Sequence, residues 1–236
     1  MLCIRKNFTD QLIPAFNRLQ QIRRDRGSLC VPDIEDKADW VEIDVQETAD
    51  GQVVVFHDSD FKKSAGVDLK IWDATLEDLA TIDIGSRVDP KFAGERVPTL
   101  AEVLDVCKGK VGVNIELKYY GHDERLEERV AEMVEAREME SQIVIMSLKK
   151  AAVMKMKALR PDWKVGLLAA VAIGDATSFE ADFLAVNVSQ AEPGLIRTAQ
   201  RRGKQIHVWT VNDAVTMSSM LSRGVDNLIT DKPALA

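Results

Sequence analysis

The sequence predicts an α/β fold in which short buried strands alternate with helices around a parallel sheet. From residue 110 onward, aliphatic runs begin near residues 143, 165, 183, 205 and 226, at intervals of 22, 18, 22 and 21 residues. Amphipathic helical patterns lie between most of these runs, which indicates a parallel sheet covered on its outer face. The length of 236 residues suits a single (β/α) barrel, because such a barrel uses about 250 residues.

The first strand of an eight-stranded barrel has to come from residues 1–33. Leu2–Arg5 is the only apolar candidate in that segment, and a helical pattern follows from Ile13 to Arg24. Seven further strands can be counted from residue 40 onward, so the barrel closes only if this segment supplies the eighth. Residues 1–33 also carry six basic and three acidic side chains, against a net charge of −7 for the whole chain.

The next strand, Trp40–Val45, is predicted to form a hairpin with the run Gln52–His57. Asp50 and Gly51 lie between them, and Asp-Gly is a strong hairpin signal. The connection is too short for a parallel crossover, so the second run is expected to return antiparallel. With the turn centred near residues 50–51, paired residue numbers sum to about 101, which would place Asp44 opposite His57.

The rest of the chain is predicted as an irregular excursion followed by regular strand and helix units. The excursion spans residues 58–98 and includes a helical piece at Leu76–Ile82. Pro161, Gly203 and Gly224 stop three of the later helices. The later strands are expected at Val111–Leu117, Ile143–Ser147, Val165–Leu168, Phe183–Asn187, Ile206–Val211 and Asn227–Thr230. The helices are expected at Leu100–Cys107, Asp123–Glu138, Ala151–Leu159, Leu195–Arg202 and Ala214–Arg223.

Composition excludes several classes of protein. The hydrophobic share of 46% is ample for a core, which excludes disorder. No window approaches about 18 uninterrupted apolar residues, so we expect no integral membrane segment. The acidic net charge disfavours nucleic acid as a partner. The three cysteines (Cys3, Cys30 and Cys107) are odd in number and far apart, and no signal-peptide run precedes them, which favours reduced thiols in the cytoplasm.

Two predicted strands carry polar residues at alternating positions. In Val41–Val45, the strand period of two places Glu42 and Asp44 on one face and the aliphatic residues on the other. A solvated edge strand would explain this pattern alone, but Asn114–Lys118 repeats it. Glu42, Asp44 and Glu116 together make the oxygen-rich ligand set that Mg²⁺ or Ca²⁺ prefers. Cysteine and histidine clusters suited to zinc are absent from the sequence.

Three histidines and one tryptophan are further candidates for a site. The hairpin brings His57 to the level of the carboxylates, and histidine is the side chain that ordinarily exchanges a proton near neutral pH, which suits acid–base work. His207 is interpreted as a packed core residue and His122 as a solvated loop residue. Trp209 lies near the end of its strand, where barrel active sites open, and is either a wall for substrate stacking or part of the core.

These residues resemble the glycerophosphodiester phosphodiesterase family. The resemblance runs in order from about residue 34 to the C-terminus, roughly six-sevenths of the chain, and its order and spacing are more specific than any one piece. It is carried by Val41–Val45, Asp50-Gly51, Val55–Asp58, Arg96–Leu100, Asn114–Lys118, Val208–Asn212 and Gly224–Pro233.

The resemblance implies one domain over residues 1–236, a (β/α)₈ TIM barrel with a small insertion at residues 59–98 after the second strand. It implies one divalent cation, Mg²⁺ or Ca²⁺, held by Glu42, Asp44 and Glu116. It also implies that His57 is one of two acid–base histidines. Lys118 would contact the phosphate, and Trp209 would form part of the substrate wall. In the family, a neighbouring hydroxyl of the substrate is thought to attack phosphorus.

The N-terminal segment departs from the family pattern. The pattern requires a His-Arg-Gly-like segment at the end of the first strand, and residues 1–33 contain no histidine. Asp25–Ser28 echoes the Arg-Gly part with Asp in place of His, about ten residues too close to Glu42. Alternatively, Arg5 stands in for that arginine, with Ile4 where the histidine should be. Neither arrangement supplies the missing proton carrier, so the first strand is predicted to be atypical or defective.

The leading hypothesis is therefore metal-dependent hydrolysis of glycerophosphodiesters to an alcohol and glycerol 3-phosphate, a small-molecule reaction. The missing histidine is expected to lower turnover by about 10²–10⁴-fold, which is the usual contribution of general acid–base catalysis. A non-catalytic barrel that binds phosphodiesters, and a related phosphodiester lyase, stay open as alternatives. The sequence does not define the oligomeric state.

Overall fold

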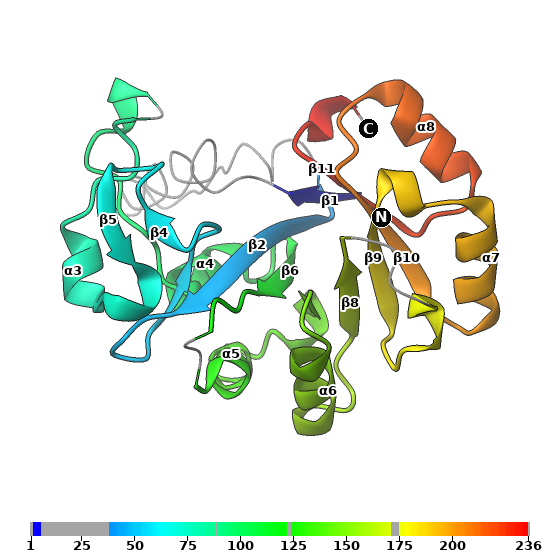
Figure 1. Cartoon of the computed structure of the whole chain (residues 1–236), viewed down its shortest axis with the longest axis horizontal. Coiled ribbons are helices and arrows are strands. Elements are labelled where there is room, and N and C mark those ends of the chain that lie inside the picture. The colour runs from blue at the N-terminus through cyan, green and yellow to red at the C-terminus, as the bar shows by residue number, and fades with distance from the viewer. Residues whose placement is uncertain (1, 6–37, 88, 122–123, 171–174, 236) are drawn as a thin grey trace.

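A computed structural model describes residues 2–5, 38–87, 89–121, 124–170 and 175–235 of the chain. In this part of the chain, parallel strands form a closed sheet in the order β1-β11-β10-β9-β8-β7-β6-β2, and β1 also pairs with β2 (Figure 1). The strands are β1 (Leu2–Arg5), β2 (Trp40–Glu47), β6 (Gly112–Leu117), β7 (Ile143–Ser147), β8 (Val165–Ala169), β9 (Phe183–Asn187), β10 (Gln205–Trp209) and β11 (Asn227–Thr230). The fold is thus an α/β barrel of the (β/α)₈ kind, as predicted.

Strand β1 closes the barrel. Its register pairs Ile4 with Thr230 of β11 on one side and with Val41 of β2 on the other. The prediction that Leu2–Arg5 supplies the eighth strand is confirmed. Because the same register pairs Arg5 with Glu42, the end of β1 reaches the level of the first predicted metal ligand. The predicted helix Ile13–Arg24 and the segment Asp25–Ser28 lie outside the described residues.

Helices cover the outer face of the barrel between successive strands. They are α4 (Leu100–Cys107), α5 (Leu126–Glu135), α6 (Lys150–Leu159), α7 (Pro193–Arg201) and α8 (Ala214–Ser222). Thr99 begins α4 with a capping box, in which its hydroxyl accepts from the Glu102 amide and the Glu102 carboxylate accepts from the Thr99 amide. The predicted cap of α5, Asp123, lies outside the described residues. The described part of the β8–β9 connection carries only the short 3₁₀ helix η4 (Ala176–Ser178).

The hairpin forms as predicted, but its register differs by one residue. Strand β3 (Val53–Val55) pairs antiparallel with β2, with Val45 opposite Val55 and Glu47 opposite Val53. The paired numbers therefore sum to 100, so the predicted pairing of Asp44 with His57 is wrong. The connection is a five-residue loop closed by the Thr48 amide on the Gln52 carbonyl at 2.9 Å, rather than a two-residue turn. Phe56 takes the place opposite Asp44, and its amide donates to the Asp44 carbonyl.

The segment between β3 and α4 builds a small lobe on one side of the barrel. It contains the two-stranded sheet β4 (Asp60–Phe61) and β5 (Val67–Lys70), the 3₁₀ helices η1 (Ile71–Asp73) and η2 (Pro90–Phe92), and helix α3 (Leu76–Ala80). Figure 1 shows this lobe in cyan at the opposite end of the long axis from α7 and α8. A bridge between Val54 and Thr99 joins the two ends of the segment.

The core has two parts because the barrel strands alternate their side chains between two faces. The larger part lies between the strands and the surrounding helices and includes Val41, Ile43 and Val45. The smaller part comprises Val144, Met146, Leu168, Phe183 and Ala185, with Trp40 and Trp209 packed against it. The polar residues of β2 and β6 alternate with the larger core, so they belong to the inner face. None of the described helices combines the length and apolar character needed to cross a bilayer.

Candidate active site

Three buried carboxylates meet on adjacent strands, β2 and β6. Glu42, Asp44 and Glu116 are 0%, 4% and 1% exposed. The register pairs Asp44 with Glu116, and strand alternation places Glu42 two residues away on the same face. One oxygen of each carboxylate lies within 4.8 Å of the others. The structure thus brings together the three residues that the alternating pattern predicts as metal ligands.

The donor set and its spacing fit a hard divalent cation. Ca²⁺ binds oxygen ligands at about 2.4 Å, so ligands on opposite sides of one ion lie about 4.8 Å apart. Mg²⁺ binds oxygen ligands at about 2.1 Å, so ligands on opposite sides of that ion lie about 4.2 Å apart, which is also within this limit. A buried group of three carboxylates also costs free energy unless cations or protons offset its charge. Glu42, Asp44 and Glu116 can therefore hold one ion together.

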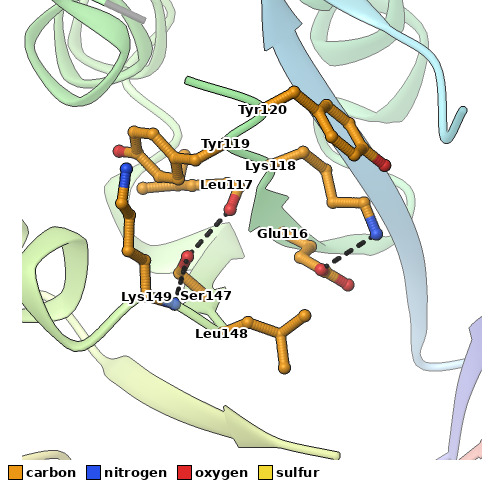
Figure 2. Close-up of a pocket in the computed structure, with 8 residues that line it drawn as sticks. All are labelled: Glu116, Leu117, Lys118, Tyr119, Tyr120, Ser147, Leu148 and Lys149. Atoms are coloured by element: carbon orange, nitrogen blue, oxygen red, sulfur yellow. Dashed lines mark hydrogen bonds and ion pairs between the residues drawn. The ribbon is translucent and has the colours of Figure 1, made fainter. Parts of the chain in front are cut away.

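Lys118 brings a positive charge to this cluster from the end of β6. Its Nζ lies 3.3 Å from Asp44 Oδ1. It also lies 3.2 Å from Glu116 Oε1, the ion pair drawn in Figure 2. Burial alone would lower the pKa of Lys118, but the charges of Asp44 and Glu116 raise it well above its usual value. The ammonium therefore stays charged beside the carboxylates and offsets part of their repulsion.

His57 follows β3, and hydrogen bonds hold its backbone and its ring. Its Nδ1 lies 2.7 Å from Asp58 Oδ1, and its side chain is 36% exposed. The Tyr120 hydroxyl donates to the His57 carbonyl at 3.0 Å. The buried Gln46 amide donates to the carbonyls of Phe56 and Asp58, on either side of the histidine. The ring is thus oriented by Asp58, while Tyr120 and Gln46 fix the backbone that carries it.

A cavity of about 230 Å³ opens beside the carboxylate cluster, at the carboxyl ends of β6 and β7. Figure 2 shows Lys118 and Tyr120 on one side of it and Tyr119 and Lys149 on the other. The residues that line it are Glu116, Leu117, Lys118, Tyr119, Tyr120, Ser147, Leu148 and Lys149. The carboxyl ends of the strands are where barrel enzymes carry their active sites.

Two of the remaining candidates, Trp209 and His207, lie on β10. Trp209 is half-buried at the end of β10 and packs against the inner core of the barrel. His207 is 1% exposed and stacks on Phe183 with ring centroids 4.2 Å apart, so its interpretation as a core residue is confirmed. Burial lowers the pKa of His207 to about 3, so its ring stays neutral near pH 7. His122 lies outside the described residues.

Four of the residues around the site had no role predicted from the sequence. Tyr119, Tyr120 and Lys149 line the cavity, and Asp58 orients His57. Tyr119 and Tyr120 directly follow the predicted strand at 111–117, so the rule that barrel sites open at strand ends could have marked them. Lys149 follows the predicted strand at 143–147 in the same way. Which of these loop residues turn toward the site depends on contacts between strands that no periodicity shows.

The fold is a (β/α)₈ barrel, and its candidate active site is acidic. Three buried carboxylates and Lys118 lie together there, beside a cavity at the strand ends. The model of the Glycerophosphoryl diester phosphodiesterase family matches residues 34–235. A glycerophosphodiester phosphodiesterase of Caldanaerobacter subterraneus subsp. tengcongensis is 31% identical over 97% of this chain and 90% of its own length. One from Bacillus subtilis is 30% identical over 84% of this chain and 75% of its own.

Solved structures show the same fold. A phosphodiesterase of Oleispira antarctica, determined in complex with the product sn-glycerol-3-phosphate, superposes with a TM-score of 0.81. The match covers 99% of this chain and 94% of that one at 22% identity. The chain therefore belongs to the glycerophosphoryl diester phosphodiesterase family, whose members are phosphoric diester hydrolases. The resemblance found in residues 34–236 is confirmed, and its beginning coincides with the family match.

Proposed function

We propose that this protein hydrolyses glycerophosphodiesters to an alcohol and glycerol 3-phosphate, with one divalent cation, Mg²⁺ or Ca²⁺, as cofactor. The observation that carries the proposal is the group of three buried carboxylates within 4.8 Å of one another, on a chain of this family. Glu42, Asp44 and Glu116 would hold the cation. When bound, the cation supplies Lewis-acid polarisation of a phosphoryl oxygen and offsets the charge that develops there.

The chain's own residues supply the rest of the chemistry. Lys118, beside the cluster, would place its ammonium against a phosphate oxygen. Because Nδ1 of His57 lies against Asp58, Nε2 is the nitrogen that would exchange a proton with the substrate. Trp209 would form part of the substrate wall. The missing first-strand histidine would lower turnover, and the reaction would take place in the cytoplasm.

The experiment measures glycerol 3-phosphate released from a glycerophosphodiester with and without Mg²⁺ or Ca²⁺. We expect release that depends on the cation, and a loss of about 10²–10⁴-fold in the His57→Ala variant. Lys150→Gln, an exposed change outside the cavity, serves as the control and should keep wild-type turnover. No release, release without any cation, or release unaffected by His57→Ala would overturn the proposal.

The relatives are named as phosphodiesterases, which favours neither of the two alternatives, a phosphodiester lyase and a non-catalytic binding barrel. A cyclic phosphate as product would indicate a lyase. Calorimetric binding of the diester without turnover would indicate a non-catalytic binding barrel.

A further inference from the structure

The cavity beside the carboxylates is the space open to the part of a substrate that extends beyond the phosphate. Glu116, a member of the carboxylate cluster, and Lys118 form its inner end. Tyr119, Leu148 and Lys149 line it as well, and Leu148 is 52% exposed, so this part opens to solvent. A diester whose phosphate lies at Lys118 would therefore extend one of its two alcohol groups along Tyr119 and Lys149.

The ring of Tyr119 already carries a cation. Nζ of Lys149 lies 4.5 Å from the ring centroid, and Figure 2 shows the lysine extending toward the ring, with its terminal nitrogen beside it. This separation is within the range of a cation–π interaction. The backbone of Lys149 is fixed by hydrogen bonds, since its amide donates to Ser147 Oγ at 3.1 Å and Ser147 Oγ donates to the Leu117 carbonyl at 2.8 Å.

The two lysines of the cavity differ in how their charge is balanced. Lys118 makes ion pairs with Asp44 and Glu116. Lys149 makes no ion pair with a carboxylate in the part of the chain that the structure describes. Among the described residues, the outer part of the cavity therefore carries an unbalanced positive charge on Lys149, which attracts anionic groups and repels cationic ones.

We propose that Lys149, lying over Tyr119, makes the protein select diesters whose alcohol group is an uncharged polyol or an anion over those that carry a quaternary ammonium group. This inference rests on the proposed function and adds the class of substrate. An aromatic face is the usual site for a quaternary ammonium ligand. Here such a ligand would have to displace the Lys149 ammonium from the ring and then remain beside a like charge. Hydroxyl or anionic groups can instead accept hydrogen bonds from Lys149.

The test compares kcat/KM for glycerophosphoglycerol and glycerophosphocholine, which differ in the charge of the alcohol group. We expect the wild type to prefer the first. Lys149→Gln should lower that preference by about three- to tenfold, the range of a cation–π contact and its charge. Lys149→Arg keeps the charge and should keep the preference. Lys150→Gln is the matched control, because Nζ of Lys150 lies over a ring outside the cavity, at 5.5 Å from Phe179.

The possible outcomes separate this inference from the proposed function. Turnover of both diesters with a ratio unchanged in Lys149→Gln, or a wild type that prefers glycerophosphocholine, would overturn the inference alone. If neither diester is turned over, the proposed function fails. In that case the ratio of the two dissociation constants, measured by calorimetry in the presence of Ca²⁺, decides the inference. Equal affinities in the wild type would then contradict it.

Discussion

At the scale of single residues, Lys118 links the stability of the barrel to the charge of its site. Its side chain is 11% exposed and lies among carboxylates that are 4% and 1% exposed. Removing one member of a buried ion pair leaves its partner charged and unpaired. The resulting loss of folding free energy is larger than the net stability that the intact pair provides. The same change would remove the proposed phosphate contact, so stability and activity should respond together.

We expect Lys118→Met to lower the free energy of unfolding by about 3 kcal/mol when no divalent cation is present. A bound cation supplies a replacement positive charge, so Ca²⁺ should restore more of the stability in this variant than in the wild type. Urea denaturation with and without Ca²⁺ measures both quantities. Lys149→Met, which removes an exposed lysine, is the control. A variant as stable as the wild type without cation would contradict this account of the charge balance.

His207 makes stability depend on pH. Burial lowers its pKa to about 3, whereas an unfolded histidine titrates near pH 6.5. The unfolded chain therefore binds more protons between these values, and stability falls as the pH falls below about 6.5. We expect the loss of stability between pH 7 and pH 5 to be about 2 kcal/mol smaller in His207→Gln. Urea denaturation of both proteins at the two pH values tests this, and equal losses would contradict it.

At the scale of elements, the aliphatic strands were the most predictable part of the molecule. β7, β9 and β11 have the predicted bounds, because short apolar runs between helix stop signals leave little choice of register in a parallel sheet. Helix α4 also matches its prediction, since the Thr99 cap and the turn after Cys107 are both local features. The bounds of these elements are set by residues close to them in the sequence, so local patterns are enough to predict them.

The hairpin shows where local patterns are insufficient. Asp-Gly correctly marked the turn, but the loop contains five residues and is shaped by side chains from elsewhere. Asp50 accepts from the Thr48 hydroxyl and from the Leu76 amide, 26 residues away. A shift of one residue exchanges the two faces of a strand. The predicted partner of Asp44 was therefore wrong, although the presence of the hairpin was correct.

The lobe between β3 and α4 contains a second group that titrates unusually. Asp83 accepts hydrogen bonds from the Ser86 hydroxyl and from the amides of Gly85, Ser86 and Gly94, which lower its pKa to about 2. Glu95 is 8% exposed. Burial, with a smaller contribution from the Asp83 charge, raises the pKa of Glu95 to about 7. The ionised Asp83 carboxylate thus holds the loop through these hydrogen bonds. The folded protein is most stable when the buried Glu95 is protonated.

We expect Glu95→Gln to stabilise the protein at pH 8 and to have little effect at pH 4.5. The folded chain binds more protons than the unfolded chain between pH 4.5 and 7, so the wild type loses stability as the pH rises through that window. The gain at pH 8 should be about 1–2 kcal/mol by urea denaturation. Glu180→Gln, at an exposed position, controls for the loss of a carboxylate. Destabilisation by Glu95→Gln at pH 8 would refute the assignment.

At the scale of the whole molecule, the barrel closes through β1, one of its two four-residue strands and the least typical of them. Strand β1 pairs with β11 and with β2, so it removes the two open edges that the other strands would leave. The sequence indicated this role only by counting, because seven strands from residue 40 onward left one to be found. Within residues 1–33, the apolar run Leu2–Arg5 was the one candidate for that strand.

Closure by β1 predicts that a proline there should be costly. Ile4 pairs in register with Thr230 and Val41, and Ile4→Pro removes a backbone donor from a strand with neighbours on both sides. We expect a fall in Tm of about 6 °C or more, measured by differential scanning calorimetry. Ile4→Val keeps the donor and should change Tm little. Equal Tm values for the two variants would show that β1 does not close the barrel.

The site as a whole was partly predictable. The period of two in β2 and β6 predicted which carboxylates share a face, and the structure brings Glu42, Asp44 and Glu116 together. The cavity was not predicted, because it depends on how the loops after β6 and β7 meet. The Ser147 hydroxyl on the Leu117 carbonyl joins these loops, and such a contact between distant residues leaves no periodic signal.

The most direct test of the central claim is the initial rate of glycerol 3-phosphate release, measured as Ca²⁺ or Mg²⁺ is titrated into the wild type and into Glu116→Gln. We predict a rate that rises from near zero and saturates as one site fills in the wild type. In the variant the rate should stay low or saturate only at much higher concentrations of cation. A rate independent of the cation, or the same titration curve for both proteins, would contradict the account.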